Sequence, residues 1–111
     1  MSWLLVALGA AVGAPLRYVA GSLLDGHLPR GTILVNWVGS LVLGWCTGLG
    51  LTGNALALLG TGFCGGLTTF SSFAVQTHDR GARLGAVNVV LTVVPALALC
   101  AVGFWVGAAQ A

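Results

Sequence analysis

The chain has 111 residues, of which 58% are hydrophobic and only 5% are charged, with a net charge of +2. A soluble domain carries roughly 25% charged residues, so this composition argues against a soluble fold and indicates a membrane protein. The few arginines are too scattered for a nucleic-acid-binding surface, and the three cysteines lack the spacing of a metal site.

Four apolar runs predict four membrane-spanning helices, over about residues 3–24, 31–51, 55–77 and 84–109. Each run is long enough to cross a bilayer, which takes about 20 apolar residues. The first run has no basic region before it, so we interpret it as a mature span rather than a secretory signal. Polar loops are expected at 25–30 and 78–83, with a short turn at 52–54. We therefore predict an all-α membrane protein with a single four-span domain over residues 1–111.

The third run contains a stretch that is poorly suited to a helix, Gly-Phe-Cys-Gly-Gly-Leu-Thr-Thr-Phe-Ser-Ser-Phe at 62–73. Adjacent glycines lose much backbone entropy in a helix, and threonine hydroxyls compete for backbone hydrogen bonds. We predict that the third helix is broken here, at mid-membrane. Lipid offers no hydrogen-bond partner, so a break is tolerated only where protein, water or a ligand satisfies its backbone groups. The break is therefore a candidate ion site.

The second run carries small and polar residues at every fourth position, which places them along one helix face. They are Thr32, Asn36, Ser40, Gly44 and Gly48. Glycines four residues apart are typical of close helix packing. For Asn36 two interpretations stay open, because a membrane amide either bonds a neighbouring helix or lines a polar path.

The chemistry of the spans argues against an enzyme, because they contain no Asp, Glu, His or Lys that would act as a base. A proton-coupled exporter of small cations is one alternative, but it needs a titratable carboxylate in the membrane, and Asp25 lies at a span end. A purely structural membrane subunit is the other alternative.

Neutral donors and one arginine remain in the spans, and this combination suits a small anion, because it replaces hydration without binding too tightly. The donors are Thr32, Asn36, Ser40, Thr68, Thr69, Ser71, Ser72, Asn88 and Thr92, and the arginine is Arg17. Phe70 and Phe73 are three residues apart, and their positive ring edges are able to face an anion. Ordinary apolar packing of the two rings is the competing interpretation.

Three motifs resemble those of the CrcB/Fluc fluoride channels: Pro-Leu-Arg-Tyr at 15–18, Gly-Thr-Ile-Leu-Val-Asn at 31–36, and the long motif at 62–73. The resemblance implies a passive fluoride-selective channel in a prokaryotic inner membrane that exports cytoplasmic fluoride and so reduces its toxicity. It also implies a dimer of four-helix subunits in opposite orientations, with two fluoride pathways. A central sodium ion, structural and not transported, is expected on the backbone carbonyls of Gly65 and Thr68 from both subunits.

The same resemblance assigns residues to the fluoride pathway. Phe70 and Phe73 resemble the paired pore phenylalanines, and Asn36 resembles the pore-lining amide. The remaining expected pathway residues are Ser71 and Ser72 in a hydroxyl track, Thr32 and Arg17 near the vestibule, and Asn88 and Thr92 on the fourth span. The last two are weaker candidates, because the family often has a tyrosine there and the only tyrosine here is Tyr18.

The arginines predict how the chain inserts into the membrane. Arg30, Arg80 and Arg83 fall in connections on one side, whereas the other side carries the 52–54 turn and both termini, without Arg or Lys. Short loops rich in Arg stay cytoplasmic. We predict both termini outside, and a partner paralogue inserted the other way in preference to a dual-topology homodimer.

Overall fold

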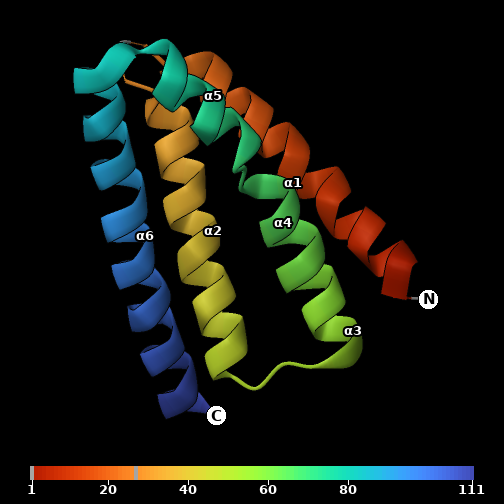
Figure 1. Ribbon diagram of the computed structural model, residues 1–111. Coiled ribbons are helices and arrows are strands. Elements are labelled where there is room, and N and C mark those ends of the chain that lie inside the picture. Colours follow the sequence, from red (N-terminus) through yellow and green to blue (C-terminus); the bar gives the residue numbers. More distant parts are fainter. Residues whose placement is uncertain (1, 27) are drawn as a thin grey trace.

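The computed structural model describes residues 2–26 and 28–111, and every named element in this part of the chain is a helix. In chain order the elements are α1 (Ser2–Leu24), α2 (Arg30–Gly48), α3 (Gly53–Ala55), the π-helix η1 (Leu56–Cys64), α4 (Gly65–Leu67), α5 (Ser71–Asp79) and α6 (Gly81–Gln110). Segments α3, η1, α4 and α5 follow one another as one long interrupted helix (Figure 1). The predicted all-α fold is confirmed.

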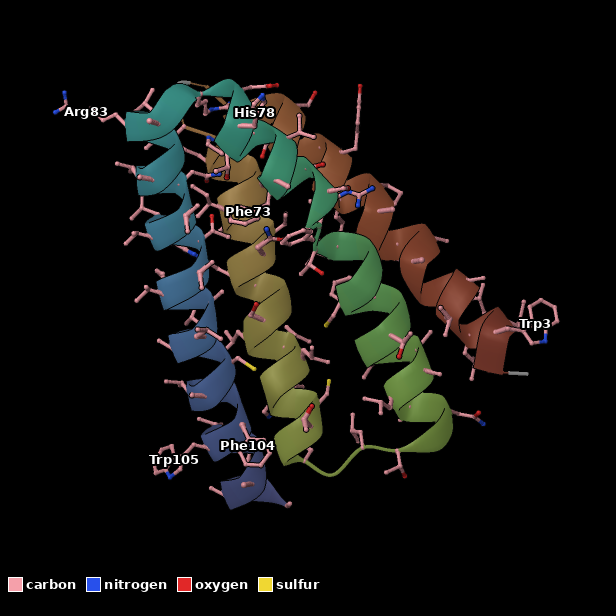
Figure 2. The ribbon with its side chains drawn as sticks, viewed as in Figure 1. Trp3, Phe73, His78, Arg83, Phe104 and Trp105 are labelled. Atoms are coloured by element: carbon pink, nitrogen blue, oxygen red, sulfur yellow. The ribbon has the colours of Figure 1, made fainter. Side chains whose placement is uncertain are left out.

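Four helical stretches are long and apolar enough to cross a membrane: Trp3–Leu24, Arg30–Gly48, Gly53–Asp79 and Gly81–Gln110. The second ends before the predicted 51, and Gly50 beyond it has a φ of +77°, a conformation that favours glycine. Exposed tryptophans project outward near the outer ends of α1 and α6, at Trp3 and Trp105 (Figure 2). Tryptophan favours the membrane interface, which agrees with helices that span a bilayer.

Helices α2 and α6 pack side by side along their lengths (Figure 1). Glycines allow this approach: a Cβ on Gly44 would meet the carbonyl of Cys100, and one on Gly48 would meet that of Phe104. Such contacts are typical of small residues four apart in membrane helices. The close helix packing predicted at Gly44 and Gly48 is confirmed.

Helix α1 lies on the other side of the interrupted helix and crosses it diagonally (Figure 1). A Cβ on Gly9 would lie 2.6 Å from the backbone nitrogen of Phe63, and one on Gly13 would lie 2.8 Å from that of Leu67. A Cβ on Gly66 would in turn lie 2.9 Å from the Cα of Ala10. The interrupted helix is therefore held against α1 by direct backbone approach.

The predicted break in the third helix is confirmed, but it does not fall at the adjacent glycines. Gly65 and Gly66 belong to α4, and the chain becomes extended only at Thr68, with φ −83° and ψ 160°. Helical structure resumes with α5 at Ser71. At Gly66 the missing side chain serves packing against α1, and this tertiary contact outweighs the low helix propensity of glycine.

The polar loop predicted at 78–83 is not a loop. His78 and Asp79 end α5, Arg83 lies inside α6, and Arg80 is the single residue between the two helices. Gly81 makes this sharp corner with a φ of +80°. The 25–30 connection is irregular as predicted up to Pro29, with Arg30 already in α2 and His27 outside the described residues. Both connections lie at the same end of the molecule, at the top of Figure 1.

Candidate functional site at the helix break

The break leaves a group of backbone carbonyls beyond the last closed turn. The Cys64 carbonyl accepts hydrogen bonds from both the backbone N–H and the hydroxyl of Thr68, at 2.9 Å and 2.8 Å. The final four carbonyls of a helix have no partner within it, and here they belong to residues 65–68. They include Gly65 and Thr68, the predicted sodium ligands.

Asn36 on α2 reaches across to Thr69, the residue after Thr68. Its Oδ1 accepts the backbone N–H of Thr69 at 2.9 Å, and its Nδ2 donates to the Thr69 carbonyl at 3.2 Å. The side chain thus replaces the helical partners that Thr69 loses at the break, so the neighbouring-segment interpretation of Asn36 is observed. An amide carries two N–H donors, and this contact uses one of them.

The hydroxyl of Thr69, two residues before α5, contacts the first turn of this helix. It accepts the backbone N–H of Ser72 at 3.2 Å, and it lies 3.3 Å from the hydroxyl of Ser71. Threonine is a favoured residue at such a position because its oxygen satisfies a free N–H of the first turn. Thr69, Ser71 and Ser72 therefore place three hydroxyl side chains around the start of α5, with Ser71 exposed and Ser72 half-buried.

The two phenylalanines form a tilted pair with ring centroids 5.9 Å apart and ring planes at 54°. Their surroundings differ, since Phe70 is 78% exposed and Phe73 is half-buried. Figure 2 shows Phe73 at the level of the upper half of α2. The predicted pairing of the rings is present, but a single chain leaves one of them largely uncovered.

An open cavity of about 750 Å³ lies between α2, the interrupted helix and α6. Six of the predicted site residues line it: Asn36, Gly65, Thr68, Phe70, Phe73 and Thr92. Sequence reasoning did not assign Thr61 or Thr47 to the site, although both hydroxyl residues line the same cavity. Only their helical spacing from the other lining residues, which places them on the same helix faces, would have indicated that they line the cavity.

The other predicted pathway residues lie outside this lining. Thr32 is buried at the start of α2, where its backbone N–H and hydroxyl contact Asp25, and Arg17 lies half-buried on α1. Asn88 is completely buried and donates to the Thr77 hydroxyl at 2.8 Å, while the Thr92 hydroxyl lies 3.3 Å from the Asn88 Oδ1. Asn88 therefore ties α6 to α5, and its place in a pathway stays a prediction.

A small four-span protein with an interrupted helix, whose freed backbone and polar side chains line a cavity, has the features of an ion-handling membrane protein. Residues 4–108 match the family described as CrcB-like protein, Camphor Resistance (CrcB). The chain belongs to this family, which confirms the resemblance seen in its motifs.

Curated relatives cover nearly the whole chain. It is 47% identical to fluoride-specific ion channel FluC 2 of Rhodococcus jostii (strain RHA1), over 94% of this chain and 96% of the relative. It is 43% identical to fluoride-specific ion channel FluC 1 of Streptomyces avermitilis, over 95% of this chain and 94% of the relative. A third relative, fluoride-specific ion channel FluC of Thermococcus kodakarensis, is 37% identical over 89% of each chain.

Replacement of Asn36 by leucine tests the role of the amide at the break. Asn36→Leu keeps similar volume but leaves the N–H and C=O of Thr69 without their partner, and each orphaned buried group costs about 1–3 kcal/mol. We expect a clearly lower unfolding temperature in detergent. The control is Val38→Leu on the exposed side of the same helix, which should unfold like the original chain. An Asn36→Leu variant as stable as this control would contradict the structural role of the amide.

Proposed function

We propose that this chain is a subunit of a passive, fluoride-selective channel through which cytoplasmic fluoride leaves a prokaryotic cell. The observation that carries the proposal is the Phe70 and Phe73 ring pair beside Asn36 at a helix break, in a chain whose family relatives are named fluoride-specific ion channels. A channel conducts its ion without covalent chemistry, so the protein is not an enzyme. It is a multi-pass protein of the cell membrane.

The arrangement suits a small and strongly hydrated anion. Fluoride that leaves water needs replacement donors, and the free N–H of Asn36 and the hydroxyls of Ser71 and Ser72 are neutral donors that release the ion again. The ring edges of Phe70 and Phe73 add the positive end of the aromatic quadrupole. The resemblance in the motifs supports a pathway role for all five residues.

The proton-coupled exporter gains no support from the acidic residues. Asp25 accepts the backbone N–H groups of Gly31 and Thr32, so its carboxylate is engaged at a helix start, and Asp79 is exposed at the end of α5. An exporter of cations needs a carboxylate that alternates between proton and substrate inside the membrane. A purely structural role would not account for the ring pair or for the open cavity.

A structural sodium ion on the carbonyls of Gly65 and Thr68 is the second part of the proposal. Carbonyl groups at broken membrane helices coordinate monovalent cations in other proteins. Both residues line the cavity, and a Cβ on Gly65 would meet nothing within 4 Å, so its backbone is approachable. The ion would neutralise the negative ends of these carbonyl dipoles.

The proposal includes a second subunit in the opposite orientation. Freed backbone groups cannot face lipid, and the open cavity and the 78% exposed Phe70 lie next to the break. A second four-helix subunit over this face would cover both. Three of the four arginines lie in or near the connections at one end of the molecule, which favours a single orientation in the membrane. A chain with one orientation needs a paralogue inserted the other way as its partner, in preference to a homodimer.

Replacement of either ring tests the fluoride pathway. Phe70→Ile and Phe73→Ile fill similar space without a polarised ring edge, and we expect about tenfold lower fluoride conduction, equivalent to roughly 1.4 kcal/mol. Growth in fluoride of a bacterial strain without its own fluoride exporter is the readout, with the partner paralogue co-expressed if the lone chain is inactive. Phe104→Ile replaces a half-exposed ring at the lower end of α6 (Figure 2), so it is the matched control and should protect fully. Full protection by both ring variants would identify the rings as packing residues.

Removal of sodium tests the cation. A ligand that binds only the folded state raises stability with its concentration, so the unfolding temperature should rise with sodium and fall when a larger cation replaces it at equal ionic strength. Fluoride conduction should be lost in parallel. Identical unfolding curves and conduction in the two cations would refute a sodium site at Gly65 and Thr68.

Reporter fusions test orientation and partner. With the chain expressed alone, reporters at both termini should be active only outside the cytoplasm, and fluoride export should need a paralogue inserted the other way. Equal reporter signals from both sides, together with full export by the lone chain, would establish a dual-topology homodimer instead.

A further inference from the structure

One carboxylate at the loop end of the molecule connects three parts of the chain. Asp25 Oδ1 accepts the backbone N–H groups of Gly31 and Thr32, at 2.8 Å and 3.2 Å. Its Oδ2 accepts the Nε2 of Gln76 at 3.2 Å and lies 3.4 Å from the hydroxyl of Thr32. The α1–α2 connection, the start of α2 and the side of α5 therefore meet at a single charged group.

Asp25 reaches the helix that lies next to the ring pair, because Phe73 lies in the first turn of α5 and Phe70 directly precedes this helix. Among its nine residues, α5 has no fully buried side chain, so apolar packing alone holds it weakly. Polar contacts are correspondingly important for its position. At its start the Asn36–Thr69 pair fixes it to α2, and toward its end Gln76 binds Asp25 and the Arg80 Nη2 donates to the Gly26 carbonyl at 3.0 Å.

The contact between Asp25 and Gln76 joins an amide donor to a carboxylate. Hydrogen bonds to an ionised acceptor are about twice as strong as neutral ones, and a carboxylate at a helix start is stabilised by the free N–H groups there. The Gln76 Oε1 is buried, and no partner for it occurs within the described residues. The amide thus turns its donor to the carboxylate although its own acceptor stays unsatisfied.

We propose that Asp25 is a positioning residue for fluoride conduction, which acts through Gln76 to hold α5 in place, together with Phe70 and Phe73 at the start of this helix. The inference rests on the proposed function, because it assumes that the ring pair conducts fluoride. Asp25 itself need not contact the ion. Its engagement with α2 also offsets a negative charge that would otherwise repel an anion from this end of the protein.

Exchange of charge between the two partners tests the tether. Gln76→Glu places two carboxylates together and should detach the end of α5, with about tenfold lower fluoride efflux, because like-charge repulsion replaces a charge-assisted bond. The double variant Asp25→Asn/Gln76→Glu again pairs a donor with one carboxylate, and the amide that replaces the Asp25 carboxylate retains an oxygen for the Gly31 and Thr32 N–H groups. It should recover most of the efflux while carrying the same new glutamate.

Asp79→Asn is the control, because it removes an exposed carboxylate from the end of α5. This variant should conduct fluoride normally. Efflux is measured from liposomes that contain purified protein, with any partner subunit required for activity, and unfolding temperatures are recorded for each variant. Failure of the double variant to recover, or normal efflux by Gln76→Glu, would overturn the positioning role while the unaltered protein still conducts. Absence of fluoride efflux from the unaltered protein would instead refute the proposed function.

Discussion

The structure depends on one constraint, which is that backbone N–H and C=O groups inside a membrane need partners. An unbroken helix satisfies them internally, whereas the extended residue Thr68 interrupts the third helix and frees several at once. The side chain of Asn36 satisfies two of them, because it binds both backbone groups of Thr69. The carbonyls that remain are what makes this region suitable for an ion.

The rest of the fold keeps the break in place. Close glycine contacts hold α1 against η1 and α4 on one side, and α2 lies against the interrupted helix on the other. Beyond the break, α5 has little buried surface and is held by polar contacts to Asn36, Asp25 and Asn88 through Thr69, Gln76 and Thr77. A half packed through close glycine contacts and a half held by polar contacts thus meet at Thr68. This arrangement gives the ring pair a defined position without a large apolar core around it.

Much of this could be predicted from the residues. Apolar run lengths predicted four spans, and the combination of glycine and threonine predicted a break in the third. The position of the break could not be predicted, because Gly66 stays in the helix and packs there against Ala10 of another helix, a contact that a single sequence does not reveal. The π-helix before it leaves no local signal, and the sharp corner at Gly81 looked like a polar loop because of its charges. The burial of Asn88 depends on Thr77 from another helix, which a single sequence does not reveal.

The site was predictable where one stretch supplies it and less so where several helices do. Phe70, Phe73, Gly65 and Thr68 come from one motif, and the structure brings them to the same cavity as Asn36. The most direct test of the whole account is the release of anions from liposomes that hold the purified protein and any required partner subunit, followed with fluoride- and chloride-sensitive electrodes. The account predicts rapid release of fluoride and retention of chloride. Retention of fluoride, or equal release of both anions, would contradict it.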